Sequence, residues 1–183
     1  MTFTPIRACL RRPTAAGLEA EFTVYNTTGR FPCTRSNSAG GRRVVNQCAV
    51  RMSLALCRSM GHDILGSYPP RTGNLHSDRC CANRSATDPQ NYRHSTRAVE
   101  LRDYLANTLG FRFEVIGSDP AVISAPNERK GIIFFLNLDG GTGSHIDYWN
   151  GSSYTNEYSG SNAPNSNLPM FRDAQRVELC ELY

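Results

Sequence analysis

The hydrophobic pattern of the chain predicts a buried helix close to the end of its first third. From Cys48 to Met60 the chain is apolar at most positions, and a helix that is apolar on most of its surface belongs inside a domain. Asn46 is a good N-cap residue, and Gly61 is a natural C-terminal stop. We therefore expect a helix that holds Cys48 in its first turn and ends at Gly61.

Further along the chain, the pattern predicts a second helix and then strands. Apolar residues recur at helical spacing over residues 96–109, and Gly110 follows them. Short apolar or alternating runs predict strands at residues 21–25, 111–116, 132–136, 144–149, 154–158 and 176–183. An early helix followed by strands indicates an α+β fold with a mainly antiparallel sheet.

The segments between these elements read as loops of one domain. Residues 26–41 and 62–93 are rich in residues that favour turns. The chain has 183 residues, of which 39% are hydrophobic, and this is enough for the core of one domain. We see no linker, and we therefore treat residues 1–183 as a single domain.

Net charge and apolar runs limit the classes of partner. The formal net charge of +4 is a mild basic bias that suits an anionic polymer, but it is too weak to indicate nucleic acid, for which no motif is present. No apolar run approaches the roughly 20 residues of a membrane span. We expect neither nucleic-acid binding nor membrane insertion.

The chain has seven cysteines, an odd number. If Cys48 stays a thiol, the others can form three disulfides, and the sequence does not choose among the pairings. These others are Cys9, Cys33, Cys57, Cys80, Cys81 and Cys180. We expect at least two disulfides, which indicates an oxidising compartment. The alternative is that some of them are thiols in the core.

Cys48 also has the position of a nucleophile. Unpaired amides and the positive end of the helix dipole would favour its thiolate, the nucleophilic form. A cysteine nucleophile needs a base, and the base needs a residue that orients it. Among the four histidines, His145 is the best placed, because it lies on a predicted strand and shares one face with Asp147 and Trp149. We expect the others to be solvated: His62, His76 and His94.

Metal and phosphate sites have no matching pattern. His76 with Cys80 and Cys81 lacks the C-x-x-C spacing of a zinc site. The glycines after Asp139 are not followed by the Lys-Ser/Thr pair of a phosphate loop. We expect no metal and no cofactor.

Three blocks of the chain resemble the type VI secretion amidase effectors of the fourth group. This family is a branch of the NlpC/P60-type, papain-like cysteine peptidases. The blocks are residues 46–53 (NQCAVRMS), 130–133 (KGII) and 144–151 (SHIDYWNG), and they occur in the order of the family. Residues 100–110 also resemble its second helix, and the resemblance is strongest over residues 44–158. It implies a papain-like fold in which an N-terminal nucleophile helix packs on the antiparallel sheet.

The resemblance implies that Cys48 is the catalytic nucleophile and that His145 is the general base. The third residue of the family is an Asp about eleven positions after the His, and counting without gaps reaches Asn156 here. An amide can also orient an imidazole. Asp147 is the alternative, but residues two apart on a strand are about 6.6 Å apart, which is long for a direct hydrogen bond. We therefore favour Asn156.

The resemblance also implies a substrate and a mechanism. The oxyanion would be received by the backbone amide of Cys48, with the side chain of Gln47 or Asn46. The implied reaction is hydrolysis of peptidoglycan stem peptides between D-glutamate and meso-diaminopimelate. The implied biological role is an antibacterial toxin, secreted or delivered to the periplasm of target bacteria and blocked by a cognate immunity protein.

Two other functions stay open. The first is a papain-like peptidase or acyltransferase with another substrate. The second is a non-catalytic, disulfide-rich secreted binding module in which Cys48 pairs with another cysteine.

Overall fold

The computed structural model describes residues 12–27, 48–66, 75–76, 92, 94–117, 129–138, 143–153 and 168–183. The helices in this part of the chain are α1 (Ala15–Thr27), α2 (Cys48–Met60), α3 (Ala98–Asn107) and α5 (Leu168–Asp173). The strands are β1 (Leu75–His76), β2 (His94–Ser95), β3 (Glu114–Val115), β4 (Gly131–Leu138), β5 (Gly143–Trp149) and β6 (Arg176–Glu181). No helix among the described residues is both long enough and apolar enough to cross a membrane.

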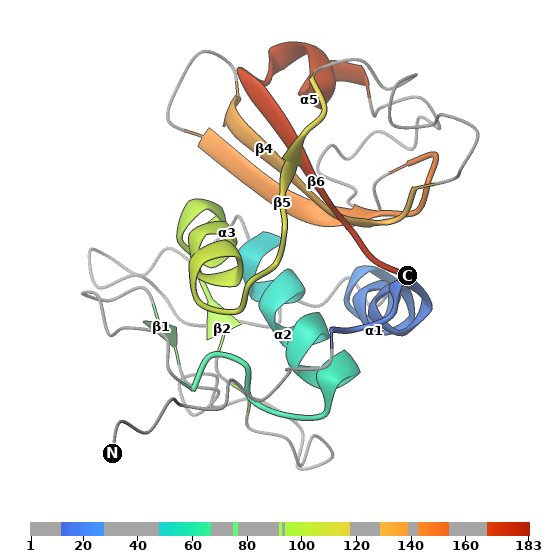
Figure 1. Cartoon of the computed structure of the whole chain (residues 1–183), viewed down its shortest axis with the longest axis vertical. Coiled ribbons are helices and arrows are strands. Elements are labelled where there is room, and N and C mark those ends of the chain that lie inside the picture. Colours follow the sequence, from blue (N-terminus) through green and yellow to red (C-terminus); the bar gives the residue numbers. More distant parts are fainter. Residues whose placement is uncertain are drawn as a thin grey trace, which may run out of the picture.

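The main sheet lies between two layers of helices. Its strand order is β3-β6-β4-β5, and all neighbouring strands are antiparallel. Helices α1, α2 and α3 lie on one side of the sheet, and α5 lies on the other (Figure 1). Strands β1 and β2 form a separate antiparallel pair. The predicted α+β fold with an antiparallel sheet is therefore confirmed, while its assignment to the papain-like class stays a prediction.

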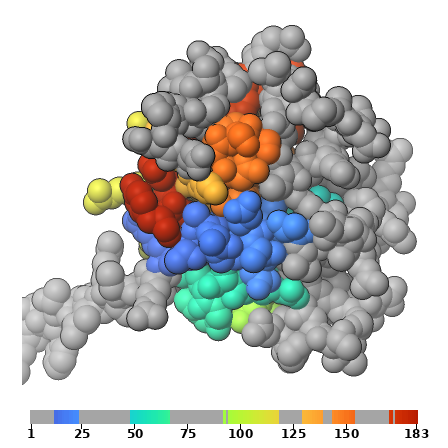
Figure 2. All heavy atoms as spheres, turned by 90° about the vertical axis from the view of Figure 1, so that its right-hand side faces the viewer, coloured from blue at the N-terminus to red at the C-terminus, as the bar shows by residue number. Residues whose placement is uncertain are grey.

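Helix α1 corrects the prediction of a strand at residues 21–25. Those residues have the aromatic and β-branched character of a strand, but Leu18 and Phe22 are four apart and are both buried in the core. The N-terminus of the helix is supported by Thr14, whose Oγ1 accepts a hydrogen bond of 3.0 Å from the amide of Gly17. Packing therefore overrides local preference. Figure 2 shows α1 in blue, between green residues of α2 and orange residues of the sheet.

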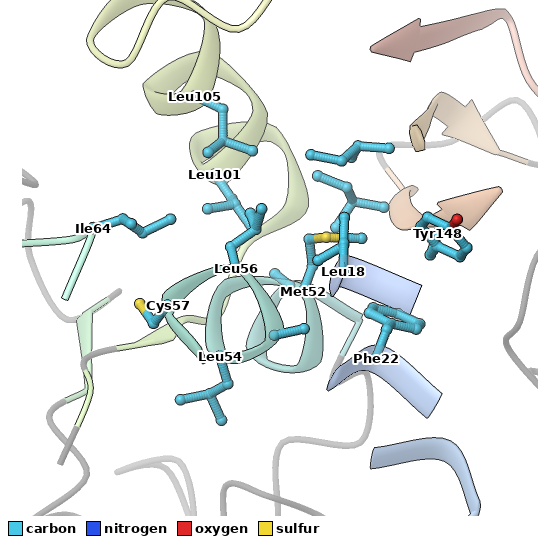
Figure 3. Packing of buried hydrophobic residues seen from close by; sticks show 14 of the residues in the cluster. Leu18, Phe22, Met52, Leu54, Leu56, Cys57, Ile64, Leu101, Leu105 and Tyr148 are labelled. Atoms are coloured by element: carbon cyan, nitrogen blue, oxygen red, sulfur yellow. The ribbon is translucent and has the colours of Figure 1, made fainter. Parts of the chain in front are cut away.

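Two hydrophobic cores explain why β4 is apolar on both faces. Ile132 and Phe134 pack with the helices α1, α2 and α3. Ile133 and Phe135 face the opposite way and pack with Phe171 of α5. Figure 3 shows the larger core, in which residues of α1, α2 and α3 meet Tyr148 of β5. The predicted strand at 132–136, buried on both faces, is confirmed.

Other predicted elements are confirmed with shifted bounds. Helix α2 begins at Cys48 and is followed by Gly61, which has a positive φ of 72°, as a C-terminal stop requires. The second predicted helix, the His145 strand and the last strand correspond to α3, β5 and β6. The strand predicted at 111–116 is reduced to β3. Asn46, the predicted strand 154–158 and most of both predicted loops lie outside the described residues.

None of the described cysteines is in a disulfide: these are Cys48, Cys57 and Cys180. For Cys57 and Cys180 this agrees with the alternative of core thiols, and the expected two disulfides stay a prediction. Both are fully buried in the larger hydrophobic core, where cysteine acts as a small apolar residue. Burial raises the pKa of Cys180 to about 11, which keeps it a thiol. The other cysteines expected to pair lie outside the described residues.

Gly131 begins β4 at a point where the chain leaves no room for a side chain. Its φ is +157°, and a Cβ atom there would collide with the carbonyl oxygen of Cys180 on β6. We expect Gly131→Ala to lower the free energy of unfolding by about 3 kcal/mol, because a strained backbone and an overpacked contact add together. Urea unfolding measures this loss.

The control is Gly143→Ala, at the start of the neighbouring strand β5. A Cβ atom at Gly143 would meet the carbonyl oxygen of Leu138 at 3.8 Å, an ordinary contact. We expect its cost to stay below about 1 kcal/mol. Equal losses in the two variants would contradict the close approach of β4 and β6 as the cause.

Candidate active site

Helix α2 presents Cys48 at its N-terminal end. Cys48 is the first residue of the helix and is only 4% exposed. The amides of a first helical turn have no partners within the helix and carry the positive end of its dipole. The helix is buried along most of its length and packs against β5. A thiolate at Cys48 would therefore be stabilised by the helix and held beside β5.

Strand β5 carries His145 and Asp147, which are 1% and 0% exposed. Nε2 of His145 lies 3.1 Å from Oδ2 of Asp147, which is a hydrogen-bond distance. The argument from spacing that this pair is too far apart is therefore wrong. The spacing of about 6.6 Å applies to the backbone, and the two side chains lean towards each other along one face and close the gap.

The Asp147 carboxylate is fixed by a second contact. Its Oδ1 accepts a hydrogen bond of 2.7 Å from the backbone N–H of Tyr148. In the described part of the sheet, β5 pairs with β4 alone, so amides on its other side need partners of another kind. Asp147 satisfies one of them with its own side chain. Both carboxylate oxygens thus have a donor, and the group has little freedom to turn away from His145.

His145 forms a hydrogen bond with the Cys48 thiol as well as with Asp147. Burial alone would lower the pKa of His145, but the charge of Cys48, the hydrogen bonds to Asp147 and Cys48, and the charge of Asp147 together raise it to about 10. The imidazole is therefore held as an imidazolium between a sulfur and a carboxylate.

The remaining predicted site residues lie outside the described residues. These are Asn46 and Gln47, expected at the oxyanion, and Asn156, favoured as the orienting residue. Among the described residues, no group of three or more His, Cys, Asp or Glu side chains is suited to a metal. The arrangement that the structure brings together is a sulfur, an imidazole and a carboxylate, which is the chemistry of nucleophilic acyl transfer.

Two other histidines test the prediction of solvated rings. His62 is exposed, as expected. His94 is 0% exposed, so that prediction is wrong. Its strand, β2, packs on α2 and α3 and is tied to α2 by a 3.0 Å hydrogen bond from the amide of Ser95 to Oγ of Ser53. The polar sequence around His94 hid this packing. For His76 the structure describes the backbone but not the side chain.

Sequence reasoning also missed Glu19, whose Oε2 accepts a hydrogen bond of 3.3 Å from the Tyr148 hydroxyl. The prediction of a strand at 21–25 concealed the helix on which Glu19 lies. The available signal was the spacing of Leu18 and Phe22 behind the cap residue Thr14.

Comparison with known proteins identifies a family whose model matches most of the chain. Residues 44–177 match a family model described as type VI secretion system amidase effector protein 4, Tae4. No protein with a curated function matches the chain.

Solved structures of Tae4 share the fold. The Tae4–Tai4 effector–immunity complex from Salmonella Typhimurium matches at 18% identity and a TM-score of 0.60, over 94% of this chain and 100% of the other. The effector Tae4 from Enterobacter cloacae matches at 18% identity and a TM-score of 0.58, over 94% of this chain and 98% of the other. Salmonella Tae4 bound to the immunity protein Tai4 from Enterobacter cloacae matches at 20% identity and a TM-score of 0.56, over 94% and 100%.

The contacts of His145 predict how its titration responds to substitution. In Cys48→Ala the thiolate charge and its hydrogen bond are lost, so we expect the pKa of His145 to fall from about 10 towards its ordinary range near 6.5. Nitrogen-15 NMR of the imidazole measures this directly. The exposed His62 is the internal control, because it is far along the chain from His145. An unchanged His145 titration would rule out Cys48 as its ionic partner.

Proposed function

This chain belongs to the Tae4 family of type VI secretion system amidase effectors, and from that membership we propose that it is a cysteine-dependent amidase that cuts bacterial peptidoglycan. The bond we propose is the γ-D-glutamyl–meso-diaminopimelate bond of the stem peptide. The contact of His145 with both Cys48 and Asp147 is the observation that carries this proposal. The net charge of +4 also suits a substrate that bears several carboxylates.

The proposed reaction proceeds in two steps. The Cys48 thiolate attacks the amide carbonyl, and the resulting oxyanion is received by the backbone amide of Cys48 with the side chain of Gln47 or Asn46. His145 gives its proton to the leaving amine, which departs and leaves a thioester on Cys48. His145 then takes a proton from water as the water attacks the thioester. The acid product leaves, and the thiolate and imidazolium are restored.

We propose Asp147, in place of Asn156, as the residue that orients His145. The 3.1 Å contact to Nε2 and the second contact to the Tyr148 amide support this assignment. A carboxylate also stabilises an imidazolium more strongly than an amide does, because the hydrogen bond is charge-assisted. The position counted from the family, Asn156, lies outside the described residues.

The proposal extends to the fold class, the place of action and a partner. A cysteine at a helix N-terminus followed by a histidine on an antiparallel strand supports a papain-like, NlpC/P60-type fold over the chain as a single domain. As an effector of this family, the protein is delivered into target bacteria, and we place its action in the periplasm, where peptidoglycan lies. Tae4 structures solved with the immunity protein Tai4 support a cognate immunity protein for this chain.

The binding-module alternative required a disulfide at Cys48. Cys48 forms no disulfide and is hydrogen-bonded to His145, which favours catalysis. A papain-like peptidase or acyltransferase with another substrate remains the alternative to test.

Digestion of purified peptidoglycan tests the substrate and the nucleophile together. We expect the protein to release tri- and tetrapeptide stems cut after D-glutamate, as read by mass spectrometry. Cys48→Ala should lower this activity by more than about a thousandfold, because the nucleophile is lost. The matched control is Cys57→Ala on the same helix, which alters a core thiol and should keep the activity. Intact stems after treatment with the wild type would refute the substrate.

The alkaline limb of the pH profile tests Asp147. Activity requires the protonated His145, so kcat/KM should fall as the pH rises through about 10. In Asp147→Asn we expect this limb to move to lower pH, because a hydrogen bond and a charge that raise the pKa of His145 are weakened. At neutral pH kcat should fall about a hundredfold. A larger loss in Asn156→Ala than in Asp147→Asn would return the orienting role to Asn156.

A further inference from the structure

Helix α1 packs on the two elements that carry the proposed catalytic pair. It lies against α2, which bears Cys48, and against β5, which bears His145. Leu18 and Phe22 of α1 are buried in the same core as Tyr148 of β5, as Figure 3 shows. Residues 15–27 also lie outside the part of the chain that matches the family model.

Tyr148 connects α1 with the site through its two ends. Its hydroxyl donates to Oε2 of Glu19 at 3.3 Å, and its backbone N–H donates to Oδ1 of Asp147 at 2.7 Å. Oδ2 of the same carboxylate meets His145. A displacement of Tyr148 would therefore move the N–H that fixes Asp147.

We propose that Glu19 and Tyr148 are positioning residues, which hold the Asp147 carboxylate against His145 by anchoring β5 to α1. This inference rests on the proposed function, because it assigns Asp147 a part in that reaction. Neither residue touches the reacting atoms.

The position of β5 explains why such an anchor is needed. In the described sheet β5 lies at the end of the order and pairs with β4 alone. One of its faces packs against helices, and in Figure 2 α1 lies beside the orange end of the sheet. A strand with one hydrogen-bonded neighbour needs further contacts if a side chain on it is to keep its place within a fraction of an ångström.

The Tyr148 hydroxyl, which donates the hydrogen bond to Glu19, stays protonated over the pH range of the proposed reaction. Burial, and then the charge and hydrogen bond of Glu19, raise the pKa of the Tyr148 hydroxyl above its usual value. The hydroxyl therefore stays protonated where the imidazolium of His145 is present, and it can donate to Oε2 of Glu19 there.

Tyr148→Phe removes the hydroxyl and keeps the buried ring. We expect kcat on purified peptidoglycan fragments to fall about three- to tenfold with KM unchanged, which is the loss of about one hydrogen bond. The alkaline limb of kcat/KM and the NMR titration midpoint of His145 should both move to lower pH by about one pH unit. Glu19→Ala should behave in the same way, and the double variant should be no worse than either single variant.

Glu19→Gln is the rescue variant, because its amide oxygen can still accept from Tyr148. Tyr104→Phe is the matched control: it removes a buried hydroxyl that donates at 2.7 Å to the carbonyl of Ile64, far along the chain from the site. We expect it to lower the Tm and to leave the limb and the His145 midpoint in place.

Three results would overturn the proposal. They are a lower Tm in Tyr148→Phe with the His145 midpoint unmoved, no effect of Glu19→Ala, or a double variant in which the two losses simply add. The NMR titration of His145 needs no substrate, so it decides the role of Tyr148 even if peptidoglycan is not cut. Failure of the wild type to cut peptidoglycan would count against the proposed function alone.

Discussion

The contact between His145, Cys48 and Asp147 is the constraint on which the described structure depends. All three side chains are almost completely buried, and an uncompensated charge in a protein interior costs on the order of several kcal/mol. The cost is offset here because each charge has a partner of opposite sign. The sulfur of Cys48 and the carboxylate of Asp147 both contact the imidazole of His145, so the three groups stabilise one another. Their placement must therefore be accurate, and this requirement extends to the elements that carry them.

Cys48 and His145 are almost a hundred residues apart in the chain. Their contact therefore depends on where the fold places α2 and β5, and not on residues adjacent to either of them in sequence. Helix α2 is fixed because nearly all of its surface is buried, so its N-terminus has one position. Strand β5 is fixed by its pairing with β4 and by its packing against α1 and α2. The close approach of β4 and β6 at Gly131 helps to fix the sheet to which β5 belongs. Accuracy at the site thus comes from rigid elements rather than from loops.

The features that the sequence predicts correctly have their signals within one segment of the chain. The features that it misses depend on contacts between distant segments. Helix α2 was predictable because its start, its apolar length and its stop at Gly61 all lie within one segment. His145 was found because its strand follows a glycine turn and because strand spacing places it on one face with Asp147 and Trp149. Helix α1 was missed because the aromatic and β-branched residues around Phe22 favour a strand, and only contact with α2 and β5 decides otherwise.

Asp147 and the buried cysteines show a second limit of prediction from the sequence. Asp147 was set aside on a distance between backbone positions, but the direction of side chains at an open strand edge decided the contact. Cys57 and Cys180 were counted as disulfide partners because a count treats every cysteine alike. Their burial in the core, which makes them inert thiols, depends on the packing of α2 against the sheet, and the count of cysteines carries no information about that packing.

A second buried carboxylate shows what separates the charge proposed for catalysis from a structural one. Glu178 of β6 is 2% exposed and lies 2.7 Å from Nε of Arg102 on α3, with Arg176 as a second partner. Both partners are guanidinium groups, which stay protonated at every pH that a protein meets, so this cluster fastens α3 to β6 and has no proton to give. Asp147 has the same burial but faces an imidazole, whose proton can leave. The difference in chemistry between the two clusters therefore lies in the basic partner, and His145 is the residue that turns a buried ion pair into a site for proton transfer.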